Sequence, residues 1–234
     1  MQIAQNPGIV QRWTDPKECC DPEWEAAYTR FETQEQETAK FLKRLRRLGA
    51  AGWSRDIAVV EIFCGRGGGL RAWEALGFSI LEGVDLSENL LTQYSGPARL
   101  YVGDCRRMAL ANSSRDVICV QGGLHHLPRL LDDLRETVSE VQRVLKPGGR
   151  FVVVEPWRTP FLSVVHALCR QPLARRISPR IDALARMIHG EERTYSQWLS
   201  RPREIRATLT QGFETEKEEI RWGKILWIGR KRAS

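Results

Sequence analysis

Residues 59–69 read VVEIFCGRGGG. The apolar run from Ile57 to Phe63 predicts a strand of a parallel sheet that helices cover on both faces. Gly65 and Gly67 allow the chain to turn tightly after this strand, with no side chain between the backbone and a ligand. A turn at the carboxyl end of the first strand lies where open α/β sheets bind ligands. The stretch therefore predicts a ligand-binding strand, turn and helix.

Strands and helices alternate after this turn. We expect strands at residues 78–85, 98–102, 117–121 and 151–154, and helices at residues 70–76, 87–94 and 130–145. Such alternation is typical of a doubly wound α/β fold with a mostly parallel sheet. Residues 215–222 and 225–229 flank a short turn and predict a closing hairpin with an antiparallel edge strand. We therefore predict one domain with a seven-stranded Rossmann-like sheet.

The composition is that of an ordinary globular protein, with 42% hydrophobic and 28% charged residues. The start of the chain lacks the pattern of a signal peptide, and no apolar run is long enough to span a bilayer. We therefore expect a cytoplasmic protein with no membrane partner. The six cysteines form no CxxC pair, and Cys19-Cys20 has no histidine or further cysteine nearby, so that we predict free thiols and no metal site.

The net charge of +7 is unevenly distributed along the chain. Residues 15–37 are acidic, whereas residues 158–206 are rich in arginine. This excess of positive charge fits an anionic substrate or a nucleic acid. It equally fits solvated helix faces, because most of these arginines alternate with apolar residues at helical spacing.

Three acids and the glycine turn define the predicted ligand. A dinucleotide motif would have its third glycine at position 70, where Leu70 stands, and Glu61 suits an amine better than a pyrophosphate. Asp85 lies twenty residues after Gly65, a spacing that suits a carboxylate binding ribose hydroxyls. Asp104 ends the third strand and is placed to accept from the amine of a purine. The ligand therefore has an amine, a ribose and an adenine-like base.

The order of these motifs resembles the class I S-adenosylmethionine-dependent methyltransferases, particularly their small-molecule, type 11-like branch. The resemblance spans residues 57–157 and rests on five segments: Glu61–Gly67, Gly83–Ser87, Gly103–Cys105, Asp116–Gln121 with Leu124–Leu127, and Leu145–Gly149 with Val152–Pro156. It implies methyl transfer as the activity and S-adenosyl-L-methionine as the cofactor. The cofactor-binding residues that it implies are Glu61, Phe63, Gly65, Gly67, Asp85, Leu86, Asp104, Cys105 and Gln121.

Two residues depart from the usual first motif of this family. Glu61 stands where an aspartate is usual, and this change keeps the negative charge on a longer side chain. Phe63 stands where a glycine is usual. Its ring either lies near the sulfonium, which an aromatic face tolerates well, or belongs to the core.

His125 and His126 are the predicted catalytic residues, because they lie just past the fourth strand on the ligand side of the sheet. Methyl transfer is an in-line displacement in which positioning supplies much of the rate. A base is needed only when the acceptor loses a proton. The alternative role of the two histidines is to organise the loop through hydrogen bonds. For His166 and His189 we expect core or surface roles.

Four regions divide the predicted domain: a helical cover over residues 1–50, a cofactor-binding core over 57–156, a helical acceptor-side insertion over 157–210 and the hairpin over 213–230. Trp24, Tyr28 and Phe31 form either a lid over the cofactor or ordinary core. In the insertion, Arg158 or Arg193 is a candidate for binding an anionic group of a small-molecule acceptor.

Three other functions compete with this interpretation. A nicotinamide-dependent reductase is disfavoured by Leu70 and by the lack of a catalytic tyrosine–lysine arrangement. A nucleic-acid methyltransferase fits the basic charge, but the chain has no Asn/Asp-Pro-Pro-aromatic run and no Pro-Cys nucleophile. A non-catalytic S-adenosylmethionine-binding module remains a third alternative.

Overall fold

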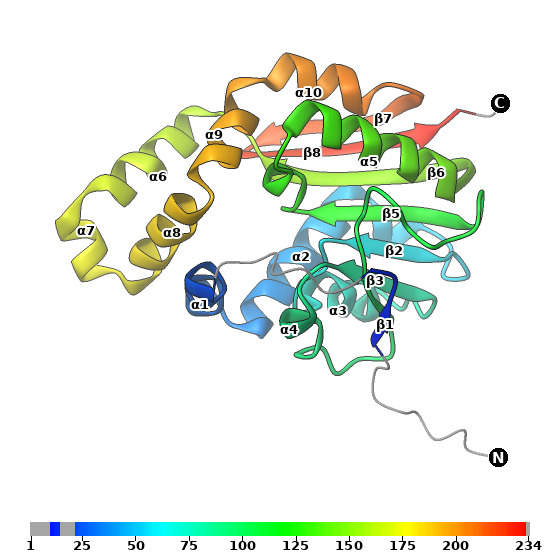
Figure 1. Ribbon diagram of the computed structural model, residues 1–234, viewed down its shortest axis with the longest axis horizontal. Coiled ribbons are helices and arrows are strands. Elements are labelled where there is room, and N and C mark those ends of the chain that lie inside the picture. Colours follow the sequence, from blue (N-terminus) through cyan, green and yellow to red (C-terminus); the bar gives the residue numbers. More distant parts are fainter. Residues whose placement is uncertain (1–9, 15–21, 233–234) are drawn as a thin grey trace.

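The computed structural model describes residues 10–14 and 22–232, and Figure 1 shows one sheet at its centre. The sheet has eight strands in the order β1-β4-β3-β2-β5-β6-β8-β7. The strands are β1 (Val10–Arg12), β2 (Val59–Ile62), β3 (Leu81–Asp85), β4 (Arg99–Val102), β5 (Arg115–Gln121), β6 (Leu145–Pro156), β7 (Phe213–Arg221) and β8 (Lys224–Lys231). Neighbours from β1 to β6 pair in parallel, and β8 pairs antiparallel with both β6 and β7.

The predicted α/β fold class is confirmed, with two corrections. The sheet has eight strands rather than seven, because residues 10–12 add a short strand beside β4 through pairs such as Gln11 with Tyr101. The antiparallel strand β8 lies between β6 and β7 and not at the edge of the sheet. Apolar residues explain this order: residues 225–228 of β8 are buried, whereas β7 is mostly charged and takes the edge.

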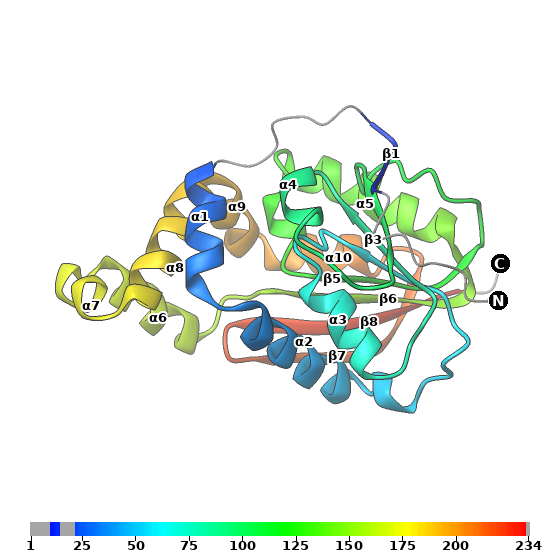
Figure 2. The same cartoon turned by 90° about the horizontal axis from the view of Figure 1, so that it is seen from below.

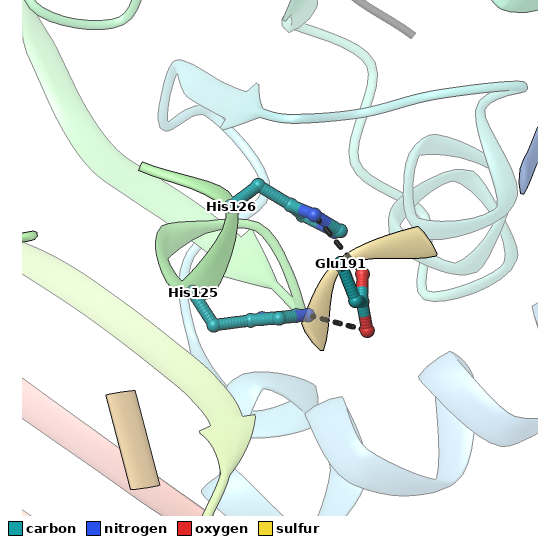
Figure 3. A group of neighbouring side chains, drawn as sticks. All are labelled: His125, His126 and Glu191. Carbon is teal, nitrogen blue, oxygen red and sulfur yellow. Dashed lines mark ion pairs between the residues drawn. The ribbon is translucent and has the colours of Figure 1, made fainter. Parts of the chain in front are cut away.

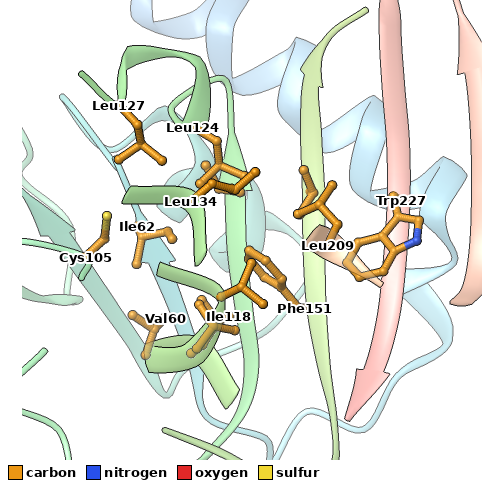
Figure 4. Close-up of a cluster of buried hydrophobic side chains, with 14 of the residues drawn as sticks. Val60, Ile62, Cys105, Ile118, Leu124, Leu127, Leu134, Phe151, Leu209 and Trp227 are labelled. Atoms are coloured by element: carbon orange, nitrogen blue, oxygen red, sulfur yellow. The ribbon is translucent and has the colours of Figure 1, made fainter. Parts of the chain in front are cut away.

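Helices cover both faces of the sheet (Figures 1 and 2). On one face, α2 (Gln34–Leu48) and α3 (Gly68–Ala75) pack against one buried cluster. On the other face, α5 (Leu130–Val144) and α10 (Pro202–Leu209) pack against a second cluster, part of which is drawn in Figure 4. Leu134, Val138 and Val141 recur on the buried side of α5 at helical spacing, as the sequence predicts.

The predicted helix boundaries follow from local signals. Ser87 caps α4 (Glu88–Leu91), where its hydroxyl oxygen accepts from the backbone N–H of Leu90 at 3.2 Å. This helix is shorter than the predicted residues 87–94. A capping box at Thr33 begins α2, and Gly49 ends it in the left-handed conformation. The short 3-10 helices η1 (Ala50–Gly52) and η2 (Leu124–His126) complete the core.

The insertion after β6 is a series of short helices: α6 (Pro160–Arg170), α7 (Pro172–Ile177), α8 (Pro179–Gly190), α9 (Glu192–Ser200) and α10. A proline near the start of α6, α7, α8 and α10 explains the division, because proline fits the first turn of a helix and ends the one before it. Figures 1 and 2 show α6, α7 and α8 projecting beyond the carboxyl ends of the strands. The N-terminal helix α1 (Pro22–Phe31) packs against α8.

Two further findings concern the cysteines and the helices. Cys64, Cys105, Cys119 and Cys169 are buried free thiols in the described part of the chain. The Cys19-Cys20 pair lies outside the described residues. Within residues 10–14 and 22–232, no helix combines the length and the apolar character that crossing a membrane requires.

Candidate functional site

The glycine turn after β2 is tied to the end of β3. Phe63, Gly65 and Gly67 have positive φ angles of 55°, 50° and 78°, so that the chain reverses sharply before α3. The backbone N–H of Gly65 donates to Oδ2 of Asp85 at 2.7 Å, and the N–H of Ser87 donates to Oδ1 at 2.8 Å. Burial raises the pKa of Asp85, and these backbone donors oppose that rise. The two predicted motifs therefore meet at the carboxyl edge of the sheet.

Glu61 and Gln121 leave polar atoms buried and unpaired beside this turn. Within residues 10–14 and 22–232, Oε2 of Glu61 and both amide atoms of Gln121 have no hydrogen-bond partner. Burial, together with the nearby charge of Glu37, raises the pKa of Glu61 to about 8. Buried polar groups are normally hydrogen-bonded, so unpaired ones indicate a place for a ligand. An amine donor would satisfy the carboxylate and the amide oxygen together.

Two glycines let neighbouring side chains approach the backbone at the same place. A Cβ atom on Gly69 would lie 1.8 Å from an oxygen of Glu61, and one on Gly123 would lie 2.2 Å from the ring of Phe63. Real Cβ atoms do not approach so closely, so a side chain at either position would have to displace Glu61 or Phe63. Glycine at both positions therefore lets these two side chains lie against the backbone.

The predicted adenine-binding residues have different surroundings. Arg106 donates to Asp104 through its guanidinium, at 2.6 Å to Oδ2, and through its backbone N–H, at 2.9 Å to Oδ1. The same guanidinium bridges to buried Asp133 at 2.8 Å. The thiol of Cys105 is buried with its sulfur 3.7 Å from the Thr137 hydroxyl. A purine amine would share Asp104 with Arg106, so cofactor contacts at Asp104, Cys105 and half-buried Leu86 stay predictions.

The N-terminal helices cover the turn through Tyr28, which the sequence suggested, and through Glu32 and Glu37, which it did not. Buried Arg66, within the first motif, donates from Nε to Glu37 at 2.9 Å and from Nη2 to the carbonyl of Glu32 at 2.7 Å. The Arg66 guanidinium lies 4.7 Å from the ring centre of Tyr28, whose hydroxyl donates to Glu37. Tyr28 therefore covers the glycine turn, whereas Phe31 stacks under Arg180 of α8.

His125 is fixed by a buried carboxylate on the next strand. Oε1 of Glu155 accepts from the backbone N–H groups of Gly123 and Leu124 at 2.7 and 2.8 Å. Its Oε2 lies 2.7 Å from Nδ1 of His125. Glu155 is fully buried at the end of β6, and it therefore holds both the loop and the imidazole ring.

Glu191, between α8 and α9, joins the two histidines (Figure 3). Its Oε2 lies 3.1 Å from Nδ1 of His126, and its Oε1 lies 3.7 Å from Nε2 of His125. Trp24 of α1 donates from its indole N–H to Glu191 at 3.1 Å and packs edge-on against His126 with ring centres 5.2 Å apart. Because Nδ1 of neutral His126 faces a carboxylate, it carries the proton and leaves a lone pair on Nε2.

The two histidines differ in their affinity for protons. Burial lowers the pKa of His125, but Glu155 and Glu191 more than offset this effect and raise it to about 9. Burial and the charge of His125 lower the pKa of His126 to about 4. Near neutral pH the pair therefore carries one positive charge, on doubly protonated His125, while His126 is neutral.

This proton also bears on metal binding at the same place. His125, His126 and Glu191 offer atoms within 4.8 Å of one another, which is close enough for a divalent ion. A histidine binds a metal ion as a neutral imidazole, whereas Glu155 and Glu191 favour the positively charged, protonated form of His125. We therefore interpret this group as an acid–base arrangement.

An open cleft of about 980 Å³ lies between α1 and the insertion, and neither His125 nor His126 is among its lining residues. Trp24 and Tyr195 line it, and they contact His126 and His125 respectively. His166 also lines the cleft, with Nε2 3.1 Å from the Tyr195 hydroxyl. The cleft lining is rich in arginine: Arg158, Arg170, Arg175 and Arg186. Exposed Arg193 is not among the lining residues.

The comparisons with known proteins agree with this geometry. Residues 60–153 match the family model described as "Methyltransferase domain". These residues are a methyltransferase domain of the class I S-adenosylmethionine-dependent family. The matched segment holds the glycine turn, Asp85, Asp104, Gln121 and both histidines, and it excludes Glu155 and the insertion.

Curated relatives of the methyltransferase domain are named for different acceptors. A demethylmenaquinone methyltransferase of Streptomyces avermitilis is 30% identical over 135 residues, which are 55% of this chain and 51% of that protein. mRNA cap guanine-N(7) methyltransferase 1 of Arabidopsis thaliana is 27% identical over 123 residues, 43% of this chain and 33% of that protein. The alignments thus span between a third and a half of the length of these relatives.

Solved structures resemble the chain over most of its length. The PH0226 protein of Pyrococcus horikoshii is 19% identical with a TM-score of 0.63, over 91% of this chain and all of that one. A SAM-dependent methyltransferase of Methanosarcina mazei is 18% identical with a TM-score of 0.58, over 80% of this chain and 98% of that one. At these identities the likeness shows the shared fold.

S-adenosyl-L-methionine, the cofactor of the family, fits the described residues. The unpaired buried atoms of Glu61 and Gln121 suit its amino acid end, and Gly69 lets the carboxylate of Glu61 lie against the backbone there. Asp85 is held at the end of β3, where a ribose-binding acid belongs.

Proposed function

We propose that this protein transfers a methyl group from S-adenosylmethionine to a small-molecule acceptor bound in the cleft beside Trp24 and Tyr195. The observation that carries the proposal is the oriented, neutral His126. Its Nδ1 is bound to Glu191, its Nε2 keeps a lone pair, and its ring contacts a residue that lines the cleft. The glycine turn, Asp85 and His126 all follow carboxyl ends of parallel strands, so cofactor and acceptor would meet at one edge of the sheet.

In the proposed mechanism, the bound cofactor supplies a methyl group on a positively charged sulfur. The cleft would hold an acceptor heteroatom in line with that methyl group, and the cofactor's sulfur would keep the electron pair of the carbon–sulfur bond that is lost. Nε2 of His126 takes the proton that the acceptor loses. Glu191 stabilises the imidazolium that forms, and Glu155 keeps His125 and the loop in place. Trp24, Tyr28 and the insertion exclude water.

Glu61 is the proposed partner of the cofactor's amine. With a pKa of about 8, its carboxyl is mostly protonated at pH 7 in the free protein, and binding a cation would ionise it. Titration of S-adenosylmethionine by calorimetry, in buffers of different ionisation enthalpy, should therefore show release of about one proton at pH 7. Glu61→Gln should abolish this release and weaken binding by about ten- to a hundredfold, because a charged hydrogen bond is lost.

Asp132→Asn is the matched control, because Asp132 is a 71% exposed acid on α5. It should leave both the affinity and the proton release unchanged. Proton release that persists in Glu61→Gln would assign the amine to another residue. Tight binding of NADH in place of S-adenosylmethionine would contradict the proposed cofactor altogether.

The acceptor is proposed to carry an anionic group that Arg158 binds. Of the two arginines that the sequence suggested, Arg158 lines the cleft, and Arg193 is exposed outside the lining. With an acceptor found by screening carboxylated and phosphorylated small molecules for methyl incorporation, Arg158→Ala should raise KM about tenfold or more. Arg193→Ala is the matched control and should leave KM unchanged. Equal effects of both substitutions would remove Arg158 from acceptor binding.

An RNA acceptor is the second candidate. Two observations favour it: the Arabidopsis relative is named as an mRNA cap methyltransferase, and the chain has a net charge of +7. Methyl incorporation into pooled RNA but into no small molecule would select this alternative. Binding of S-adenosylmethionine without methyl transfer to either class would support a non-catalytic module.

A further inference from the structure

The surface of α6 and α7 carries a concentration of exposed apolar side chains. Eight large hydrophobic residues are exposed in the described part of the chain, and six of them lie here or against α6. We name these six residues the α6–α7 apolar surface: Phe161, Val164, Leu168, Leu173, Ile177 and Trp222. Contiguous exposed apolar residues in a folded domain usually mark a binding surface.

Their spacing places them on one side of each helix. Phe161, Val164 and Leu168 follow one another at three and four residues on α6, and Leu173 and Ile177 are four residues apart on α7. Leu173 and Ile177 are the most exposed, at 69% and 73%. Figures 1 and 2 show α7 at the far end of the projecting helices, away from the sheet.

Trp222 extends this surface at the turn between β7 and β8. Its ring packs edge-on against Phe161, with ring centres 5.2 Å apart, and it is 60% exposed. The guanidinium of Arg221 lies 5.4 Å from the Trp222 ring centre. A tryptophan beside an arginine, next to apolar residues, is the combination that membrane–water interfaces favour.

The segment that carries most of the apolar surface is strongly positive, although Arg158, Arg170, Arg175 and Arg186 also line the cleft and the last two pair with Asp182. Residues 157–190 contain six arginines and one aspartate, a net charge of +5 out of +7 for the whole chain. The six are Arg158, Arg170, Arg175, Arg176, Arg180 and Arg186. The sequence left open whether these arginines bind an anion or only solvate helix faces. If the arginines only kept the helix faces in contact with water, the exposed apolar residues on the same helices would have no explanation.

We propose that the α6–α7 apolar surface docks the protein onto an anionic lipid membrane. Arginines attract the negatively charged headgroups, and the apolar side chains insert at the interface. A second copy of this chain is a poorer occupant, because it would bring two strongly positive surfaces together. A nucleic acid would use the arginines but leave the apolar residues exposed.

Docking of this kind differs from the membrane role that the sequence analysis excluded. The expectation of no membrane partner rested on the absence of a spanning segment, and an interfacial helix needs none. Arg158, Leu162 and Arg170 belong both to this region and to the lining of the acceptor cleft. The docked protein would therefore hold the mouth of the cleft close to the lipid surface.

Sedimentation with vesicles tests the proposal without cofactor or acceptor, so its result is independent of the proposed function. The full chain should pellet with vesicles of phosphatidylcholine mixed with phosphatidylglycerol, and much less with phosphatidylcholine alone. Raising the salt concentration should weaken binding, because it screens the arginines. Equal binding to both kinds of vesicle, or to neither, would overturn the proposal.

Variants locate the surface. Leu173→Glu combined with Ile177→Glu should reduce partitioning about tenfold or more, and Arg176→Gln should reduce it about fivefold. Ile80→Glu is the matched control, since Ile80 is 48% exposed at the amino end of β3, on the opposite edge of the sheet. Circular dichroism checks that each variant is folded. If Leu173→Glu with Ile177→Glu instead dissolves a dimer formed without lipid, a second copy covers this surface and the proposal fails.

Discussion

Replacing His126 by alanine should lower kcat about a hundred- to ten-thousandfold, because this is the usual contribution of a positioned general base. The affinity for S-adenosylmethionine should stay unchanged, since the residues proposed to bind its amine and ribose lie on β2, β3 and β5 and not on the loop that holds His126. In the wild-type protein, kcat should fall as the pH is lowered toward about 4, where His126 becomes protonated. Initial rates of methyl transfer to the acceptor identified by screening, measured across pH, check both expectations.

Asp132→Asn is again the control for this substitution. The side chain of Asp132 is 71% exposed on α5, and Asp132 is not among the residues that line the cleft. This variant should keep the wild-type rate and pH profile. An unchanged kcat in His126→Ala would mean that the acceptor loses no proton to this residue. The histidines would then act as organisers of the loop, which is the alternative that the sequence left open.

The parts of the fold that depend on local patterns were predictable from the sequence. Glycines after an apolar strand locate the turn. Ser87 marks the start of α4, because a capping side chain bonds to a backbone N–H only three residues further along the chain. Strand β1 was missed because its stability comes from pairing with β4, about ninety positions later in the chain. The position of β8 inside the sheet depends on the burial of its apolar side chains. The hairpin pattern in the sequence predicts two paired strands but not which of them lies at the edge.

The same distinction applies to the site. Glu61, Asp85 and the histidines were predicted as site residues because each lies in, ends or follows a strand that the sequence predicts. Glu191 was missed, since it lies 65 residues from His126 in an insertion of short helices, and its approach depends on how α8 and α9 pack. A signal for Glu155 was present: a charged residue directly after three valines predicts a buried acid that needs a partner.

Glu155→Ala should have the largest effect on stability of any change at the site. Removing one partner from a buried ion pair usually costs about 3–5 kcal/mol, because the other charge is left uncompensated. Here the substitution also removes the acceptor for the backbone N–H groups of Gly123 and Leu124. Chemical denaturation followed by circular dichroism should therefore show a loss in the unfolding free energy of about this size, with an unchanged dependence on denaturant.

The stabilisation that the pair of His125 and Glu155 provides depends on pH. The pKa of His125 is raised from 6.5 to about 9, so its contribution is complete below pH 6.5 and is lost as the pH rises through about 9. The pKa of Glu155 is lowered from 4.5 by His125 and the backbone donors, although burial opposes this, so its contribution is present above pH 4.5 and is lost in acid. The pair therefore contributes most between pH 4.5 and 6.5.

Glu155→Gln separates the two effects of the substitution, since an amide oxygen still accepts from the backbone but carries no charge. This variant should recover part of the stability lost in Glu155→Ala. It should also lower the pKa of His125, which histidine proton resonances measured by NMR across pH would report. A His125 that titrates alike in both proteins would show that Glu155 acts on the loop alone, and the charge of His125 would then come from Glu191.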